Sequence, residues 1–308
     1  MLAELTGRIT GTFLDEITID IGSHNWSADD WRICFDAMAF IGIDTVIIIR
    51  GGLRDQAVFP SEVVGNAHDP DLAQLFLDEA SERQMRLFFG TYDTCQFYHQ
   101  GEAALDEEIR LGRAFAEEVV HRYQGHPAWC GWYITHEFSA NQPGVNRLFR
   151  ETAVHLKTLC PSHRCLISPF YPTVLTGREE NMTPGKFLAS WQEALDGTRG
   201  LIDIVAFQDG TAPAENYEGY LQAVQALGQS CGVEIWNNVE TFDRHMSYRF
   251  PPRDYRVLLR RLMRANPYVT KHITFEFSHF MSPNSEFPGA ANLYRRYCET
   301  ILGVPSPF

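Results

Sequence analysis

The sequence lacks the features of membrane proteins, exported proteins and nucleic-acid-binding proteins. No segment of its 308 residues approaches the roughly 18 uninterrupted apolar residues of a membrane-spanning helix. The start, MLAELTGRITGTFLDE, has no basic patch followed by an apolar stretch. Lys and Arg never cluster densely enough to follow a phosphate backbone, and the net charge is -13. We therefore expect a cytoplasmic protein that binds neither a membrane nor nucleic acid.

A disulfide framework is also missing. The 7 cysteines are odd in number and scattered along the chain, and several lie inside apolar runs. Paired cysteines in small exported domains have regular spacings and an even count. The sequence therefore predicts buried free thiols.

Several motifs that mark cofactor, metal or nucleophile chemistry are absent. The chain has no GxGxxG and no Walker A pattern, so a nucleotide-binding sheet is not indicated. It has no HExxH, no HxH after the first expected strand and no GxSxG. We therefore predict no cofactor and no metal. Four histidines at expected strand ends keep a site of mixed His and carboxylate ligands open as an alternative: His24, His99, His136 and His279.

What the sequence does contain is a regular alternation of apolar, β-rich runs and amphipathic helical segments. Eight such runs recur at roughly 40-residue intervals, which is the length of a β/α unit. They span residues 9–17, 43–52, 85–93, 128–137, 164–172, 201–210, 232–242 and 272–280. The pattern predicts an α/β fold, a single (β/α)8 TIM barrel that occupies residues 1–308 as one domain.

The segments between these runs support the barrel. Ser27 is placed to cap a helix whose apolar stripe includes Trp31 and Phe35, and Gly42 suits the left-handed residue that ends it. The Pro-rich and Gly-rich stretches all follow the carboxyl end of an expected strand. Long βα loops on that side are where barrel enzymes build their substrate pockets.

Two glutamates end the fourth and seventh expected strands. In AWCGWYITHE, Glu137 shares parity with Tyr133, and in VEIWNNVE, Glu240 shares parity with Trp236 and Asn238. Because side chains alternate along a strand, both glutamates are predicted to point into the barrel mouth. Two carboxyl groups facing one sugar linkage are what glycoside hydrolysis requires. This pairing predicts a glycosidase.

Other polar and aromatic residues fall at equivalent rim positions. Carboxylates there can grip sugar hydroxyls through charge-assisted hydrogen bonds, aromatic rings can stack on the C–H faces of a sugar, and Arg50 can pair with a rim acid or bind an anionic sugar. The predicted substrate-binding residues are Glu16, Trp26, Arg50, Tyr92, Asp93, Tyr171, Asp209, Trp236, Asn238 and Glu276. For each of them, core packing, loop capping or ion pairing is the alternative.

The motifs GTFLDE, GIDTVII, GWYITHEF, ISPFYP and the Glu240 strand give the chain a family resemblance. Over residues 8–302 the chain resembles a bacterial family of glycoside-hydrolase-like TIM barrels known only as a domain of unknown function. More distantly it resembles the clan of retaining barrel glycosidases, in which Glu after strand four is the acid/base and Glu after strand seven the nucleophile. That clan usually has Asn before the acid/base, whereas this chain has His136.

The sequence thus predicts a glycoside hydrolase of carbohydrate metabolism, with Glu137 as acid/base, Glu240 as nucleophile and an oligosaccharide or glycoside as substrate. Two alternatives stay open. One is a metal-dependent sugar isomerase or epimerase in which Glu137, Asp209, Glu240 and His279 hold a divalent ion. The other is a barrel that binds carbohydrate without catalysis. Both are decided by experiment rather than by the residue pattern.

Overall fold

A computed structural model of the chain describes residues 7–18, 24–65, 71–172, 182–212, 215–243 and 250–308. Eight parallel strands close into a barrel in the order β1-β11-β10-β9-β8-β7-β5-β2. These strands are β1 (Ile9–Leu14), β2 (Thr45–Ile48), β5 (Arg86–Gly90), β7 (Trp129–Ile134), β8 (Arg164–Ile167), β9 (Ile204–Gln208), β10 (Glu234–Glu240) and β11 (Lys271–Phe275). The predicted (β/α)8 barrel is confirmed.

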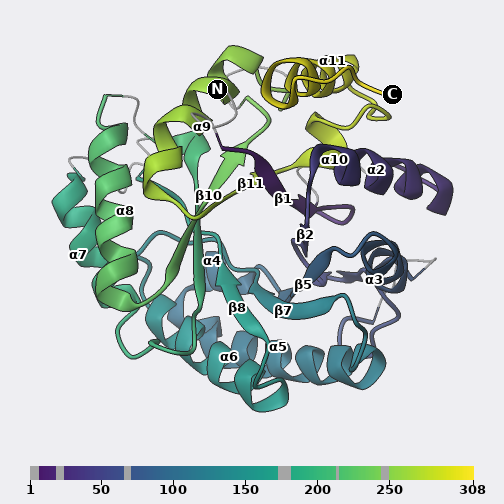
Figure 1. Cartoon of the computed structure of the whole chain (residues 1–308). Helices are drawn as coiled ribbons and strands as arrows, with labels where there is room; N and C mark the ends of the chain where they lie inside the picture. The colour runs from purple at the N-terminus through teal and green to yellow at the C-terminus, as the bar shows by residue number, and fades with distance from the viewer. Residues whose placement is uncertain (1–6, 19–23, 66–70, 173–181, 213–214, 244–249) are drawn as a thin grey trace.

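Helices surround the strands on all sides (Figure 1). The larger ones are α2 (Ala28–Ile41), α3 (Leu72–Glu82), α5 (Glu102–Tyr123), α6 (Val145–Leu159), α7 (Pro184–Ala194), α8 (Tyr217–Cys231), α9 (Tyr255–Ala265) and α11 (Pro288–Tyr297). Short helices α4 (Gln96–Gln100) and α10 (Phe277–Phe280) lie in βα loops. No helix of the described residues is long and apolar enough to cross a membrane.

The first helix shows how local sequence sets its ends. The Ser27 hydroxyl accepts the backbone N–H of Asp30, and the Asp30 carboxylate accepts the backbone N–H of Ser27, which forms a capping box. At the other end Gly42 has φ 87°, a left-handed conformation that favours glycine. Both predicted caps of this helix are confirmed.

The strands divide the apolar side chains into two cores, one inside the barrel and one between the strands and the helices. Inward-facing side chains, among them Phe13, Phe88, Tyr133 and Trp236, fill the barrel interior. Outward-facing side chains such as Trp132 and Ile134 join the larger core between the strands and the helices. The predicted alternation of β7 and β10 is confirmed, and Glu240, the last residue of β10, shares the inward parity of Trp236.

Several strands end earlier than the apolar runs predict: β7 ends at Ile134 instead of residue 137, and β8 ends at Ile167 instead of residue 172. Two of the loops that follow strands also contain further structure. The segment after β2 carries a hairpin of β3 (Gly52–Leu53) and β4 (Gln56–Ala57), and β3 also pairs with β6 (Tyr92–Asp93). The eighth strand, expected to run to residue 280, ends at Phe275. The Glu276 carboxylate accepts the backbone N–H groups of Ser278 and His279, and these bonds cap α10 in place of further strand.

Candidate active site

Glu137 lies just beyond β7 between a cation and two phenols. Its Oε2 is 3.6 Å from Nη2 of Arg50, and its Oε1 accepts a long hydrogen bond of 3.4 Å from the Tyr133 hydroxyl. The backbone N–H of Glu137 donates to the Tyr98 hydroxyl at 2.9 Å, which fixes the chain at this point. The Glu137 side chain is 18% exposed. A ligand at the mouth of the barrel can therefore reach this carboxylate.

Glu240 is the last residue of β10 and is fully buried. Its Oε2 lies 3.7 Å from Nη2 of Arg253, whose Nη1 is 3.5 Å from Oδ1 of Asp209. The backbone N–H of Glu240 donates to the same Asp209 oxygen at 3.1 Å. Arg253 thus lies between two carboxylates and compensates the charge of both. Burial raises the pKa of Asp209, although Arg253 and Arg261 act in the opposite direction.

The Glu240 carboxylate packs directly on the backbone after β9. A Cβ atom placed on Gly210 would lie 1.6 Å from Oε2 of Glu240 and 2.0 Å from its Cδ. Only a residue without a side chain fits at this point while Glu240 keeps its position. Gly210 is therefore part of the wall that orients the carboxylate.

Asp15 directly follows β1 and interacts electrostatically with Arg50. Its Oδ1 accepts the backbone N–H of Thr18 at 3.1 Å, and the Thr18 hydroxyl accepts Nη1 of Arg50 at 3.0 Å. Oδ2 of Asp15 is buried without a hydrogen-bond partner. Burial raises the pKa of Asp15, and Arg50 opposes this shift.

Two of the predicted sugar-binding carboxylates each hold a histidine. Oε2 of Glu16 lies 2.9 Å from Nδ1 of His24, and Oε1 of Glu276 lies 2.7 Å from Nδ1 of His279. The two imidazole rings are close together, with centroids 3.5 Å apart. The ends of β1 and β11 therefore meet in a buried cluster of two acids and two histidines.

His136 turns away from the barrel mouth. Its Nε2 lies 2.9 Å from Oε1 of Glu108 on α5 and 3.9 Å from Oδ1 of Asp93. The opposite parity of His136 and Glu137 agrees with the sequence-based expectation. Burial alone would lower the pKa of His136, but Asp93 and Glu108 outweigh burial and raise it. For Glu108, burial would raise the pKa, yet the hydrogen bond and charge of His136 and the hydrogen bonds from Thr94 together outweigh burial, and the pKa is lowered.

Among the described residues, Asp93, Glu108 and His136 form a buried group whose ligand atoms come close enough to hold a metal ion. Their donor set would accept zinc or a similar ion. However, Nδ1 of His136 has no hydrogen-bond partner, whereas a metal-bound histidine nearly always donates its second ring N–H. Direct bonding between His136 and Glu108 accounts for the contact without a metal.

Three predicted substrate-binding residues lie in apolar cores instead of the mouth. Tyr171 is buried against Phe187 and Phe207 on the helix side of the barrel. Tyr92 packs on Phe115 and donates its hydroxyl to the carbonyl of Arg54. Trp236 fills the barrel interior and donates Nε1–H to Glu234 at the start of β10. None of the three presents a free ring face to a sugar, so we do not retain them as ligand contacts.

The remaining predicted residues have mixed surroundings. Trp26 is half-buried, with its ring 4.0 Å from that of His24. Asp93 is buried and accepts the backbone N–H of Cys95 at 2.7 Å, as a loop-capping residue does. Asn238 is buried inside the barrel and donates Nδ2–H to the Ser168 hydroxyl at 3.1 Å. Of these three, Trp26 alone offers a partly accessible surface.

Residues that the sequence-based list missed contact the two glutamates. Tyr98 is 38% exposed and receives the Glu137 backbone N–H, while Arg253 lies between Asp209 and Glu240. Tyr98 belongs to the rim aromatics visible in the sequence. Arg253 follows the two prolines of a long loop after the seventh strand, and nothing in that spacing indicates which acid it meets.

Buried polar atoms without a hydrogen-bond partner are frequent at the strand ends. Those near the mouth are Asp15 Oδ2, His24 Nε2, Arg50 Nε, Asp93 Oδ2, Asp209 Oδ2, Asn238 Oδ1 and Arg253 Nη1. Most buried polar groups in proteins are bonded, and exceptions concentrate where a ligand or ordered water completes the set. This distribution is typical of a site for a ligand rich in donors and acceptors.

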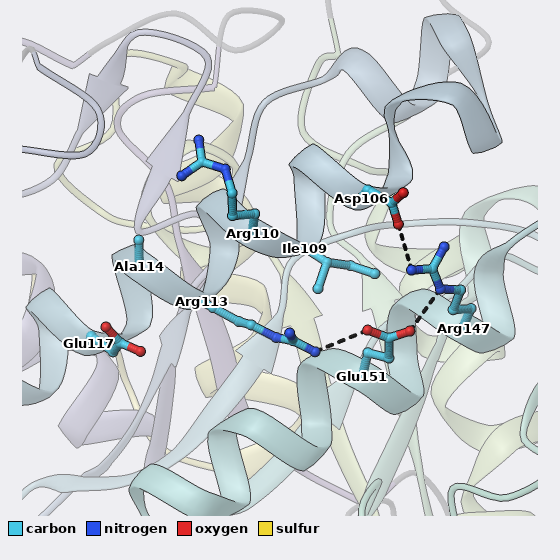
Figure 2. A pocket seen from close by; sticks show the side chains of 8 residues that line it. All are labelled: Asp106, Ile109, Arg110, Arg113, Ala114, Glu117, Arg147 and Glu151. Atoms are coloured by element: carbon cyan, nitrogen blue, oxygen red, sulfur yellow. Dashed lines mark hydrogen bonds and ion pairs between the residues drawn. The ribbon is translucent and has the colours of Figure 1, made fainter.

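A hollow lies between α5 and α6 on the helical layer. Figure 2 shows its charged side chains, among them Arg113 and Arg147, joined to Asp106 and Glu151. Its volume is about 330 Å³, and Glu151 alone accepts hydrogen bonds from Arg113 at 3.0 Å and Arg147 at 2.7 Å. Because these charges neutralise one another, the hollow is a surface ion-pair network rather than a second site.

The chain belongs to the family described as a domain of unknown function, DUF4434, whose profile matches residues 9–287. No curated protein matches the chain. The crystal structure of a Bacteroides thetaiotaomicron protein, provisionally named an alpha-L-fucosidase, is similar at 35% sequence identity and a TM-score of 0.91. That similarity covers 96% of this chain and 93% of the Bacteroides chain. The expected membership of a glycoside-hydrolase-like barrel family of unknown function is confirmed.

More distant similarities concern the fold alone. The intracellular xylanase of Thermoanaerobacterium saccharolyticum, solved with xylotriose, has 14% identity and a TM-score of 0.53, over 89% of this chain and 87% of its own. The beta-D-glucuronidase of Dictyoglomus thermophilum has 12% identity and a TM-score of 0.56, over 95% of this chain and 50% of its own. At these identities the two structures show that this chain shares their barrel fold.

Proposed function

We propose that this member of the DUF4434 family is a glycoside hydrolase in which Glu137 is the general acid/base and Glu240 is the nucleophile. The observation that carries the proposal is the position of the two glutamates at the carboxyl ends of the fourth and seventh barrel strands. Glu137 lies just beyond β7, and Glu240 is the last residue of β10. That end of a (β/α)8 barrel is where its enzymes carry out their chemistry. The names of the similar structures agree with sugar chemistry.

The surroundings of each glutamate fit its proposed role. Glu137 is the more accessible of the two, as an acid that must reach a leaving-group oxygen requires. Glu240 is buried, and Nη2 of Arg253 lies 3.7 Å from the carboxylate oxygen Oε2 of this proposed nucleophile. In the first step Glu240 attacks the anomeric carbon while Glu137 protonates the departing oxygen; in the second, Glu137 deprotonates the water that releases the sugar.

The metal-dependent alternative receives less support from the same contacts. Its predicted ligands include Asp209 and Glu240, but the guanidinium of Arg253 already lies between these two carboxylates. A divalent ion at this place would have to displace that cation. We therefore keep the hydrolase as the conclusion, with an oligosaccharide or glycoside as substrate.

The test compares wild type with Glu137→Gln and Glu240→Gln on aryl glycosides that include the alpha-L-fucoside. Both variants should lose turnover by about 10³-fold or more on substrates with poor leaving groups. With a dinitrophenyl leaving group, which needs no proton, Glu137→Gln should recover much of its first-step rate and Glu240→Gln should not. Full activity of both variants on a cleaved glycoside would contradict the assignment, and binding without turnover by wild type would favour a non-catalytic barrel.

A further inference from the structure

We propose that Asp15 and His24 bind hydroxyl groups of the sugar unit whose linkage is broken, in a subsite formed by the ends of β1 and β11. This inference rests on the proposed glycosidase function. The ligand is an uncharged sugar unit with free hydroxyl groups. Neither residue belongs to the proposed catalytic pair.

Two fixed histidines define the subsite. Each imidazole is held through Nδ1 by its own carboxylate, His24 by Glu16 at 2.9 Å and His279 by Glu276 at 2.7 Å. A carboxylate accepts the Nδ1 proton, and this bond sets both the orientation and the tautomer of the ring. In the neutral form of His24, Nε2 is then left as an acceptor.

That Nε2 atom is buried and has no hydrogen-bond partner, and the same holds for Oδ2 of Asp15. His24 is 5% exposed and Asp15 is 2% exposed. A buried polar atom without a hydrogen-bond partner is costly, so two such atoms in one cluster are unfavourable until a ligand or water bonds them. Both atoms accept hydrogen bonds, and a sugar offers hydroxyl donors at adjacent carbons.

Oδ2 of Asp15 and Nε2 of His24 lie in the same cluster of side chains. The His24 ring lies 3.5 Å from that of His279, and Asp15 interacts electrostatically with His279 and Glu276. Trp26 lies beside His24 with a centroid distance of 4.0 Å and is half-buried. An aromatic ring next to hydroxyl-binding groups is the usual composition of a sugar-binding site.

A chain of contacts leads from this cluster to the proposed acid/base. Asp15 accepts the backbone N–H of Thr18, the Thr18 hydroxyl accepts Nη1 of Arg50, and Nη2 of Arg50 lies 3.6 Å from Glu137. The cluster is therefore on the same face of the barrel as Glu137 and connected to it through Arg50. A sugar unit bound here would have its linkage next to the proposed catalytic carboxylate.

The inference changes the predicted role of Glu276. This carboxylate is fully buried and accepts hydrogen bonds from the backbone and hydroxyl of Ser278 and from the backbone of His279, besides holding the His279 ring. It has no capacity left for a sugar hydroxyl. Glu16 likewise holds the ring of His24 through Oε2, so both acids position a histidine.

The test uses Asp15→Asn and His24→Gln, with His155→Gln as the matched control. His155 lies on α6, outside the barrel, 3.4 Å from Glu117, and its Nε2 also lacks a hydrogen-bond partner. We expect each subsite variant to weaken competitive inhibition by the free monosaccharide of the best substrate by about 10- to 100-fold and to lower kcat/KM similarly. His155→Gln should change neither. Removing from the substrate the hydroxyl that His24 binds should lower kcat/KM of the wild type much more than it lowers kcat/KM of the His24→Gln variant.

The subsite would be refuted if both folded variants were inhibited by the monosaccharide as strongly as wild type, or if His155→Gln lost as much inhibition as they do. The proposed hydrolase function would still stand in that case, provided that Glu137→Gln is inactive. If wild type cleaves no glycoside, the proposed function fails separately. Calorimetric titration of wild type and variants with L-fucose, D-xylose and D-glucose then decides the subsite alone. Should a variant fail to fold, the imidazole resonances of His24 in wild type must shift on addition of sugar, and their constancy would reject the proposal.

Discussion

Gly210→Ala is the smallest change that should displace the proposed nucleophile. The added Cβ would lie 1.6 Å from Oε2 and 2.5 Å from Oε1 of Glu240, whereas ordinary contacts of a Cβ begin at 3.4 Å. The difference requires Oε2 to move by about 1.8 Å, because overlap of this size cannot be absorbed by the packing. The nearest atoms belong to the end of a flexible side chain, so Glu240 moves before the backbone does.

The expected consequence is a large loss of activity with a small loss of stability. A misplacement of about 1 Å at a reacting group can reduce turnover by about 10²-fold. The moved carboxylate also leaves its position 3.7 Å from Arg253, and overpacking of a buried site costs about 1–3 kcal/mol. We therefore expect kcat to fall by at least about 10²-fold, while thermal unfolding shifts by only a few degrees.

The control is Gly112→Ala on α5, where a Cβ meets nothing within 4 Å. Alanine in a helix interior is favoured over glycine by about 1 kcal/mol, so this variant should be slightly stabilised and fully active. Both variants are assayed on the aryl glycoside that wild type cleaves best, together with thermal unfolding. If Gly210→Ala keeps wild-type kcat, the carboxylate of Glu240 is not where catalysis needs it, and its assignment as nucleophile is wrong.

Two further predictions concern buried titratable groups. Because the pKa of His136 is raised in the folded chain, its stabilising effect is complete below about pH 6.5 and is lost as the pH rises through the folded pKa. The free energy of unfolding of wild type relative to His136→Gln should therefore decrease from about pH 6 to pH 9, and a constant difference in denaturant titrations would contradict the Glu108 pairing. Burial raises the pKa of Cys165 to about 12 and that of Cys34 further still, so iodoacetamide should alkylate neither thiol in the native protein. In urea without reductant, all 7 thiols should react, because all are free cysteines. If mass spectrometry finds Cys34 alkylated in the native state, the core around it opens.

The barrel could be predicted from sequence because its determinants are local. A buried parallel strand reads as a short apolar run, and the helix between two runs has its own caps, as Ser27 and Gly42 show. Strand alternation then placed Tyr133 and Trp236 correctly in the barrel interior, since parity survives small errors in strand length. The predicted end of β11 was wrong because the Glu276 carboxylate accepts hydrogen bonds from the backbone that follows it. The periodicity of apolar residues gives no sign of such a side-chain bond.

The partners of the site residues could not be predicted, because they come from distant parts of the chain. Glu108 reaches His136 from the helix before its strand, and Arg253, in the loop after β10, reaches Asp209, in the loop after β9. Aromatic residues were the weakest part of the list for a related reason. Tyr171 and Trp236 have aromatic rings of the kind that stack on sugars, but only the packed structure shows that other side chains enclose these rings.

His136 occupies the position before the proposed acid/base, where the resembling glycosidases usually have Asn. Its ring is engaged by Glu108, and its parity directs it toward the helices, so it cannot take over a sugar contact from the barrel side. A glycosidase built on this chain must then bind its sugar hydroxyls from other strand ends. The ends of β1 and β11 carry unsatisfied acceptors at Asp15 and His24, next to Arg50 and Glu137. The departure at His136 and the cluster around His24 therefore support the same proposal, in which sugar recognition has moved away from the strand that carries the acid/base.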